Sequence, residues 1–212
     1  MKKTITLFTV LLMISSTLTT KAYIDLATGV SSPSKWVNVT PSSNSFDFLK
    51  DQQTGSGSVS QDLVGDATHG VFYIQYDANG TITTTDDELG FRFRVSNADG
   101  VHKDTFQYYV FIGLDYDLNG SIDAFIGMYN PDNNGSKSIS VYSSDPGKLN
   151  ISPSTTGFGD KLFEAAPIHG DTWDLMVTDD GSNFNGDADY FVSFKMKITD
   201  RKLQYQVVHF LK

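Results

Sequence analysis

Hydrophobic and polar residues alternate with a period of two in the clearest segments of this chain. Phe91, Phe93 and Val95 fall on one face of an extended segment, and Arg92 and Arg94 fall on the other. This is the period of a half-buried β-strand. No stretch combines a hydrophobic period of 3.6 residues with helix caps, so the pattern predicts an all-β protein.

Strand-like segments follow one another from residue 71 onward, separated by turn signals such as Asn79-Gly80 and Asn134-Gly135. Residues 106–114 (FQYYVFIGL) form a nearly continuous apolar run, as expected for a central strand. About nine short strands without helices predict an antiparallel β-sandwich that is jelly-roll-like. The expected strands are 71–77, 91–95, 106–114, 123–129, 138–142, 172–178, 190–198 and 203–211, with one or two more before residue 60.

The first 22 residues differ from the rest of the chain. Two lysines precede a short apolar run from Leu7 to Ile14, and Thr20 and Ala22 provide small residues before a cleavage point. This is the pattern of a secretory signal peptide, and the run is too short for a membrane span, which needs about 20 residues. We therefore expect a signal peptide at 1–22 and a single β-sandwich domain at 23–212.

The expected mature chain is acidic and has no cysteine. Removing residues 1–22 takes away three of the 16 basic residues and none of the 25 acidic ones, which leaves a net charge of −12. The chain has no basic stripe, which argues against nucleic acid and anionic membrane surfaces as partners. The lack of cysteine excludes thiol catalysis, zinc–thiolate sites and disulfides. The part at about 31–60 is rich in Ser, Gly and Asn and predicts long loops.

One segment, Asp115 to Asp123, reads D-x-D-x-N-G-x-I-D and carries the clearest chemistry. Side-chain oxygens at alternate positions of a tight loop can all turn inward, and Gly120 permits the sharp bend. Calcium (Ca²⁺) takes six to eight oxygen ligands of this kind, whereas magnesium prefers few protein ligands and many waters. The expected ligands are Asp115, Asp117, Asn119, Ser121 through its carbonyl oxygen, and Asp123, directly or through a water.

The loop has an alternative interpretation as a solvated turn, because Asp, Asn and Gly favour turns without any metal. Its spacing is similar to the first nine positions of an EF-hand loop, but Ile126 stands where the EF-hand has its bidentate Glu, and the flanking segments are strand-like. It more closely resembles the D-x-D-x-D-G-x-x-D loops of integrin-type repeats, with Gly127 four residues past the last Asp. Three acidic groups within nine residues would repel one another without a cation, so we favour calcium.

The chain also resembles β domains of exported bacterial surface proteins, in which an Asp-rich loop follows a central strand. The stretches that carry this resemblance are Asp62–Tyr76, Leu89–Val95, the Asp115–Asp123 loop and Ser152–Thr156. The short MKK-type start is also bacterial in character. Together with the predicted signal peptide, this context gives an expected location in the periplasm, at the cell surface or outside the cell. The resemblance implies no activity.

A fainter echo of the loop lies downstream, where Asn185–Val192 lines up with Asn119–Ile126. In the echo, Asn and Gly stand where the first loop has Asp117 and Asp115, so charge and one ligand are lost. It is interpreted as a second site, a contributor to the first, or a repeated hairpin without metal, and we favour the last. The residues of this second candidate site are Asn183, Asn185, Asp187 and Asp189.

Other groups give weaker indications. The four histidines are widely separated and form no zinc motif. Arg92 and Arg94 on one strand face are the only hint of a catalytic cleft, and they are equally consistent with solvent exposure or pairing with acids. Aromatic residues that could stack on sugar rings are Trp36, Tyr108, Tyr109, Tyr129, Tyr142 and Trp173, although strand aromatics are commonly core residues.

These patterns predict an exported, calcium-binding β-sandwich that acts as an extracellular or cell-surface binding or adhesion module, with a glycan or surface protein as partner. Catalytic residues are not indicated, and an enzyme is the less favoured interpretation. The alternatives are a secreted polysaccharide lyase or glycoside hydrolase on a jelly-roll fold, a non-catalytic carbohydrate-binding module, or a subunit of a larger surface assembly. The sequence predicts no oligomeric state.

Overall fold

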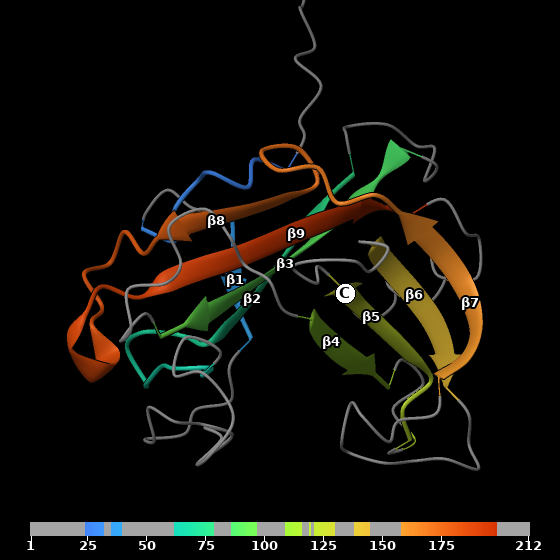
Figure 1. The fold of residues 1–212 in the computed structure, drawn as a ribbon, viewed down its shortest axis with the longest axis horizontal. Coiled ribbons are helices and arrows are strands. Elements are labelled where there is room, and N and C mark those ends of the chain that lie inside the picture. Colours follow the sequence, from blue (N-terminus) through green and yellow to red (C-terminus); the bar gives the residue numbers. More distant parts are fainter. Residues whose placement is uncertain are drawn as a thin grey trace, which may run out of the picture.

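The computed structural model describes residues 24–31, 35–39, 62–78, 86–96, 109–115, 119, 121–129, 138–144 and 158–198. The predicted signal peptide at 1–22 and the predicted strand at 203–211 lie outside these residues. Within them the chain forms nine strands and one short 3₁₀ turn (Figure 1). The strands are β1 (Val37–Asn38), β2 (Phe72–Asp77), β3 (Glu88–Val95), β4 (Tyr109–Leu114), β5 (Ala124–Tyr129), β6 (Ser138–Ser144), β7 (Phe158–Ala165), β8 (Trp173–Val177) and β9 (Tyr190–Lys197).

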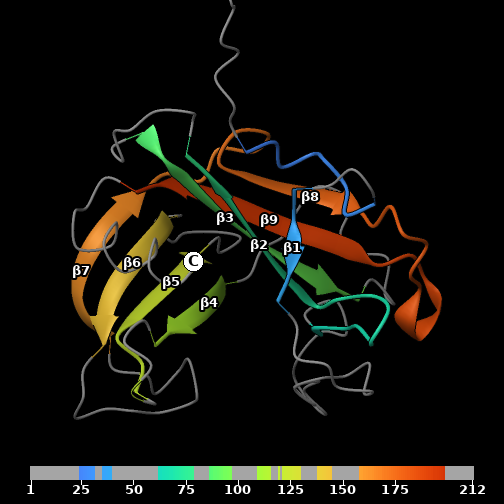
Figure 2. The ribbon, with the colours of Figure 1, turned by 180° about the vertical axis from the view of Figure 1, so that it is seen from behind.

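The strands form two antiparallel sheets that pack face to face, so the predicted all-β sandwich is confirmed. The first sheet has five strands in the order β1-β2-β3-β9-β8, and the second has four in the order β4-β5-β6-β7. The second sheet is a meander of consecutive strands, as both ribbon views show (Figures 1 and 2). All pairings between the strands of each sheet are antiparallel.

The main core lies between the sheets and follows the predicted alternation. Phe91, Phe93 and Val95 of β3 point into it and are almost fully buried. Phe194 of β9 packs between the two phenylalanines, with ring centroids 5.3 Å from Phe91 and 6.3 Å from Phe93. Ile126 of β5 and its neighbours on the second sheet supply the opposite wall. Burial of each such side chain contributes about 1.5–3 kcal/mol to folding.

The other face of the five-stranded sheet carries polar side chains that are also buried. Arg92 and Arg94 are both 0% exposed, and Lys195 on the neighbouring strand is 7% exposed. Residues 24–31 and Trp36 cover this face and contact the guanidinium of Arg92. The predicted split of β3 into an apolar and an arginine face is therefore confirmed, but the arginines face a covered layer and not solvent.

Two strands differ from the sequence-based expectation. Strand β7 is not predicted, because register shifts opposite Tyr142 interrupt its alternation and leave Leu162 45% exposed. The apolar run at 106–114 predicts a central strand, but β4 stands at the end of its sheet among the described strands. Its run is apolar because Val110 and Ile112 contact the core while Phe111 lies on the outer face.

In the parts of the chain that are described, no helix is long and apolar enough to cross a membrane.

Candidate metal site and its buried counterpart

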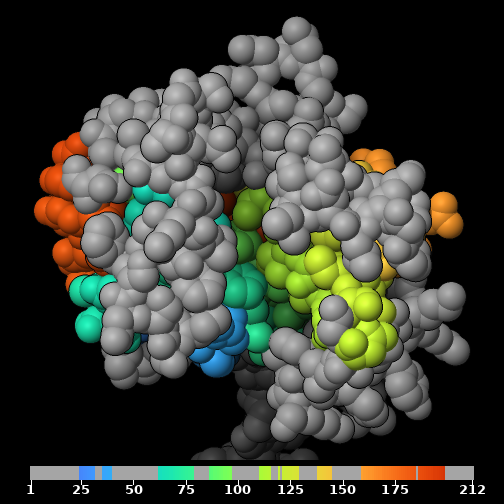
Figure 3. Space-filling model, turned by 90° about the horizontal axis from the view of Figure 1, so that it is seen from below, coloured from blue at the N-terminus to red at the C-terminus, as the bar shows by residue number. Residues whose placement is uncertain are grey.

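The predicted calcium loop connects β4 to β5 at one end of the four-stranded sheet. The N–H of Asp123 donates to the carbonyl oxygen of Leu114 at 2.7 Å, which closes the loop. The carbonyl oxygen of Asp123 accepts from Ser144 of β6 at 3.0 Å, so the end of the loop is fixed to the next strand as well. In Figure 3 the yellow-green residues of this part of the chain reach the molecular surface, where ions have access.

Two predicted ligand side chains turn back into the loop. Asp115 Oδ1 accepts a hydrogen bond from the backbone N–H of Asn119 at 3.1 Å. Asn119 Oδ1 accepts one from the backbone N–H of Ser121 at 2.8 Å. These bonds link positions one, five and seven of the motif, and such bonds hold Asp and Asn side chains over their own turn. Asp115 and Asn119 therefore each hold part of the loop backbone through a side-chain oxygen.

The structure describes four of the five predicted calcium ligands. Asp115, Asn119, Ser121 and Asp123 lie in this loop, whereas Asp117 lies outside the described residues. Among the described residues, no group of three or more His, Asp or Glu side chains is close enough to hold a metal ion. The full ligand set stays a prediction, because it includes Asp117.

The downstream echo loop has a different arrangement, built around the buried Asp189. This side chain is 0% exposed, and its two oxygens accept from the N–H of Phe184 at 3.2 and 3.3 Å. Phe184 begins a 3₁₀ turn that ends at Gly186, where φ is +111° and glycine is required. Burial raises the pKa of Asp189, although hydrogen bonds and the charge of Arg94 oppose the shift.

The echo loop does not gather its predicted ligands. Of the second candidate set, Asp189 points into the protein, whereas Asn183 and Asp187 are exposed. The side chain of Asn185 is outside the described part of the chain. The preference for a hairpin without metal stays a prediction.

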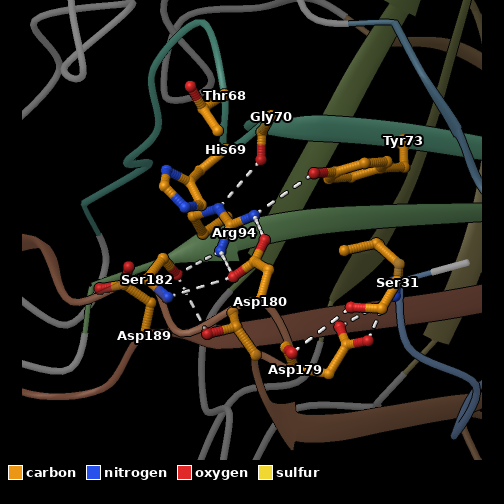
Figure 4. Close-up of polar contacts among 12 residues, drawn as sticks. Ser31, Thr68, His69, Gly70, Tyr73, Arg94, Asp179, Asp180, Ser182 and Asp189 are labelled. Atoms are coloured by element: carbon orange, nitrogen blue, oxygen red, sulfur yellow. Dashed lines mark hydrogen bonds and ion pairs between the residues drawn. The ribbon is translucent and has the colours of Figure 1, made fainter.

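Arg94 is the centre of the polar network beside the echo loop (Figure 4). Its two terminal nitrogens donate to the carboxylate of Asp180 at 3.0 and 2.5 Å. It also donates to Ser182 Oγ, to the carbonyl oxygen of Gly70 at 3.0 Å and to the hydroxyl of Tyr73 at 3.3 Å. Burial raises the pKa of Asp180, but the hydrogen bond and charge of Arg94 outweigh it and hold that pKa below its ordinary value.

Arg92 is satisfied by the N-terminal segment. Its guanidinium donates to the carbonyl oxygens of Leu26 and Thr28, both at 2.6 Å, and to Ser193 Oγ at 2.8 Å. It stacks over the ring of Trp36, 4.1 Å from the centroid. Burial lowers the pKa of Arg92 to about 10. Both arginines are therefore bound by the chain itself, and they give no support to a carbohydrate-active enzyme with a cleft around them.

Of the aromatic residues proposed to stack on sugar rings, those that the structure describes are either buried or on the outer face of the four-stranded sheet. Trp36 and Trp173 are buried, at 6% and 7% exposed, so neither is a platform for sugar rings. Tyr142 lies on the outer face of the four-stranded sheet, where its ring meets Phe111 edge to face at 6.1 Å. Tyr108 and the side chains of Tyr109 and Tyr129 lie outside the described part.

Two of the four histidines are described, and each contacts an aspartate. His69 Nδ1 lies 3.1 Å from Asp66, and His169 Nε2 lies 3.2 Å from Asp174. They lie in separate turns, before β2 and before β8. Each contact is a single pair with one aspartate.

The fold and the site define an all-β protein, a sandwich of two antiparallel sheets with a polar loop at the end of the smaller sheet. Comparison of the chain with protein-family models, curated proteins and solved structures finds no match. Functional conclusions therefore depend on the geometry of this chain alone.

Proposed function

We propose that this chain is an exported, calcium-binding β-sandwich that serves as a binding or adhesion module at or outside the cell surface. The role of calcium is structural: it fixes the β4–β5 connection and neutralises its charge. The observation that carries the proposal is that the side chains of Asp115 and Asn119 accept N–H groups of their own loop. Both side chains therefore lie over the loop, and their carboxylate and amide oxygens are ligands of the kind that calcium takes.

The charge distribution along the sequence supports a metal ion as the counter-charge of this loop. No Lys, Arg or His occurs between Lys103 and Lys137, a stretch that contains Asp115, Asp117 and Asp123. Calcium fits this role better than magnesium, because the donors are carboxylate, amide and carbonyl oxygens in a flexible loop.

Thermal unfolding of the mature chain, residues 23–212, tests the proposal. We expect millimolar calcium to raise the melting temperature relative to chelator, because a ligand that binds only the folded state stabilises it by mass action. Magnesium should do so far less, and Asp117→Ala should abolish the calcium effect. Equal melting temperatures in calcium and chelator would contradict the proposal and leave the loop as an ordinary turn.

A carbohydrate-binding module is the second candidate function, favoured by the outer face of the four-stranded sheet. Phe111, Phe125 and Tyr142 lie on this face, and the proposed calcium loop connects the strands that carry the two phenylalanines. Aromatic faces stack on sugar rings, while Lys161, 5.9 Å from the Tyr142 ring centroid, can serve as a hydrogen-bond donor. Affinity electrophoresis in soluble polysaccharides should show retardation that Tyr142→Ala removes and Val177→Ala, at an exposed site on the other sheet, does not. Retardation that is equal in all three proteins, or absent in all, would exclude this candidate.

A further inference from the structure

The turn from Asp66 to His69, which leads into β2, holds its histidine in a fixed orientation. Asp66 Oδ1 accepts the backbone N–H groups of Thr68 at 2.7 Å and of His69 at 2.6 Å. The N–H of Asp66 in turn donates to the carbonyl oxygen of His69 at 2.8 Å, which closes the turn. The same Oδ1 lies 3.1 Å from Nδ1 of the His69 ring. One carboxylate therefore sets both the backbone of the turn and the direction of the imidazole.

The second ring nitrogen of His69, Nε2, is available to a ligand. Within the described part of the chain it has no hydrogen-bond partner, and the side chain is 28% exposed. Burial raises the pKa of Asp66, but the hydrogen bonds from His69 and Thr68 outweigh it and hold that pKa below its ordinary value. Because Asp66 is ionised at neutral pH, it favours the tautomer of His69 with the proton on Nδ1. Nε2 is thus left as a hydrogen-bond acceptor.

The 183–189 loop brings an aromatic ring to the same place. Phe184 and His69 have ring centroids 5.9 Å apart and nearly perpendicular ring planes, at 81°. The N–H of Phe184 donates to the buried Asp189, which fixes the backbone of the loop at this residue. Both rings belong to half-buried residues, whereas Thr68 and Asn183, their neighbours in the sequence, are exposed. Two adjoining turns therefore bring an imidazole, an aromatic ring, a hydroxyl and an amide to the surface.

One buried side chain holds both turns. Arg94 is 0% exposed, and its Nε donates to the carbonyl oxygen of Gly70, directly after the histidine. Its terminal nitrogens donate to Asp180 and Ser182, which lead into the neighbouring loop. Figure 4 shows the His69 ring on one side of the Arg94 guanidinium and these loop residues on the other. A site whose two parts are fixed by one buried group exists before a ligand arrives, so binding costs little ordering.

The chemistry of these two segments favours a neutral ligand that is rich in hydroxyl groups. Neither residues 62–78 nor residues 179–189 contain Lys or Arg, and Asp187 is exposed, so the two segments do not attract an anion. A sugar offers hydroxyl donors for Nε2 of His69 and a C–H face for the ring of Phe184. The two rings are 5.9 Å apart, so one sugar residue can contact both.

We propose that His69 and Phe184 form a binding site for a neutral glycan. His69 Nε2 accepts a hydrogen bond from a sugar hydroxyl, and the ring of Phe184 packs against the C–H face of the same sugar. Asp66 is a positioning residue that acts through His69. This inference rests on the proposed role of the chain as a binding module. It places the glycan beside the five-stranded sheet and not on the Tyr142 face of the four-stranded sheet.

Affinity electrophoresis of the mature chain, residues 23–212, tests this site in soluble galactomannan, xyloglucan, mixed-linkage β-glucan and dextran, with alginate as an anionic polymer. We expect at least one neutral polymer to retard the wild type and alginate not to do so. His69→Ala should raise the dissociation constant about tenfold, because a hydrogen bond to the ligand is lost. Phe184→Leu keeps an apolar side chain in the loop but removes the ring, and it should weaken binding to a similar degree.

The other described histidine provides a matched control. His169 also contacts one aspartate, Asp174, at 3.2 Å in a turn before β8, so His169→Ala should leave the retardation unchanged. Tyr142→Ala should leave it unchanged as well. Asp66→Asn keeps an acceptor for the N–H groups of the turn but removes the charge beside Nδ1. Nitrogen-15 NMR should then show that His69 loses its preference for the tautomer protonated on Nδ1, a change that a merely structural role of Asp66 would not produce.

Melting temperatures with and without calcium are measured on the same proteins, so failure of this site and failure of the calcium proposal are distinguishable. Variants of His69 and Phe184 that keep wild-type melting temperatures and wild-type retardation would overturn the site, whatever the calcium result. Retardation lost only in Tyr142→Ala would overturn it by assigning the glycan to the other sheet. A wild type that no neutral polymer retards would overturn it too, and a rise in its melting temperature with calcium would leave the calcium proposal intact.

Discussion

Two loops of this molecule share a sequence pattern and differ in how their negative charge is balanced. The Asp115–Asp123 loop and the 183–189 loop both contain Asn-Gly followed by an aspartate and a strand. In the second, Arg94 from β3 lies beside the turn, pairs with Asp180 and lowers the pKa that Asp189 would otherwise have. Neither loop has a basic residue close to it in the sequence, since none occurs between Lys103 and Lys137 or between His169 and Lys195.

An Asx-rich motif does not by itself define a metal site. A carboxylate in a turn needs a counter-charge or hydrogen-bond donors, and either the protein or the solvent can supply them. Where a buried arginine fills this role, as beside Asp189, the loop is a structural corner. Around Asp115, calcium is the counter-charge that we propose.

Replacement of Arg94 should have the largest effect. Arg94→Met removes the partner of Asp180 and leaves a partly buried carboxylate beside the buried Asp189, so we expect a loss of about 3–5 kcal/mol in the free energy of unfolding. Urea denaturation measures this loss in the free energy of unfolding. Lys161→Met, at the exposed ion pair with Glu164, is the control and should change stability little. Equal stability of the two variants would mean that Arg94 is not the counter-charge of the second loop.

Removal of the Asp180 charge should cost about 2 kcal/mol at neutral pH, because charge-assisted hydrogen bonds to Arg94 are lost in Asp180→Asn. The pKa of Asp180 is lowered by folding, so its stabilising contribution is complete above about pH 4 and is lost as the pH falls through the lower folded-state value. Asp189, with a raised pKa, acts in the opposite direction. Denaturation at pH 7 and pH 3 should therefore show a smaller pH dependence in the variant than in the wild type. If the pH dependence of the unfolding free energy is the same in Asp180→Asn and in the wild type, the ionised Asp180 does not make the proposed contribution to stability.

Matched asparagine variants compare the two loops directly. Asn119→Ala removes a predicted calcium ligand and the acceptor for the N–H of Ser121, and we expect calcium affinity to fall about tenfold, which corresponds to about 1.4 kcal/mol. Asn183→Ala, at the exposed start of the 3₁₀ turn, should leave calcium affinity unchanged. Calcium titrations followed by tyrosine fluorescence provide the measurement. A loss of affinity in the Asn183 variant would assign the second loop to the site.

Tyr73→Phe should have the smallest effect in this series. The Tyr73 hydroxyl is the most distant of the Arg94 partners, at 3.3 Å, and its loss leaves four other hydrogen bonds of that guanidinium in place. We expect a loss of about 0.5–1 kcal/mol in unfolding free energy by urea denaturation. A loss as large as that of Arg94→Met would show that Tyr73, and not Asp180, is the principal partner of Arg94.

Much of the fold follows from local alternation in the sequence. The strict pattern around Phe91 and Phe93 predicts β3 and its core face. The segment at 72–77 is recognised by its β-branched and aromatic residues. Strand β7 escapes prediction because its irregular register against β6 breaks the period of two. Local patterns carry no information about such an irregularity, which depends on the neighbouring strand.

The polar network shows what the sequence could not predict. Arg94 and Asp180 are 86 residues apart, so their pairing depends on tertiary structure. The contacts of Arg92 also depend on tertiary structure, because its partners in the N-terminal segment, residues 24–31, are more than 60 residues away. The alternation of apolar and polar residues in β3 places both arginines on the face opposite the core. It does not reveal that residues 24–31 cover this face. The calcium loop is the opposite case, because all five of its predicted ligands lie within nine consecutive residues.

Isothermal titration calorimetry of calcium into the mature chain tests the central comparison most directly, with Asp117→Asn and Asp189→Asn measured alongside. We predict binding to the wild type with one dominant site, loss of binding in Asp117→Asn, and unchanged binding in Asp189→Asn. No heat of binding in the wild type, or a binding loss in Asp189→Asn equal to that in Asp117→Asn, would contradict the account.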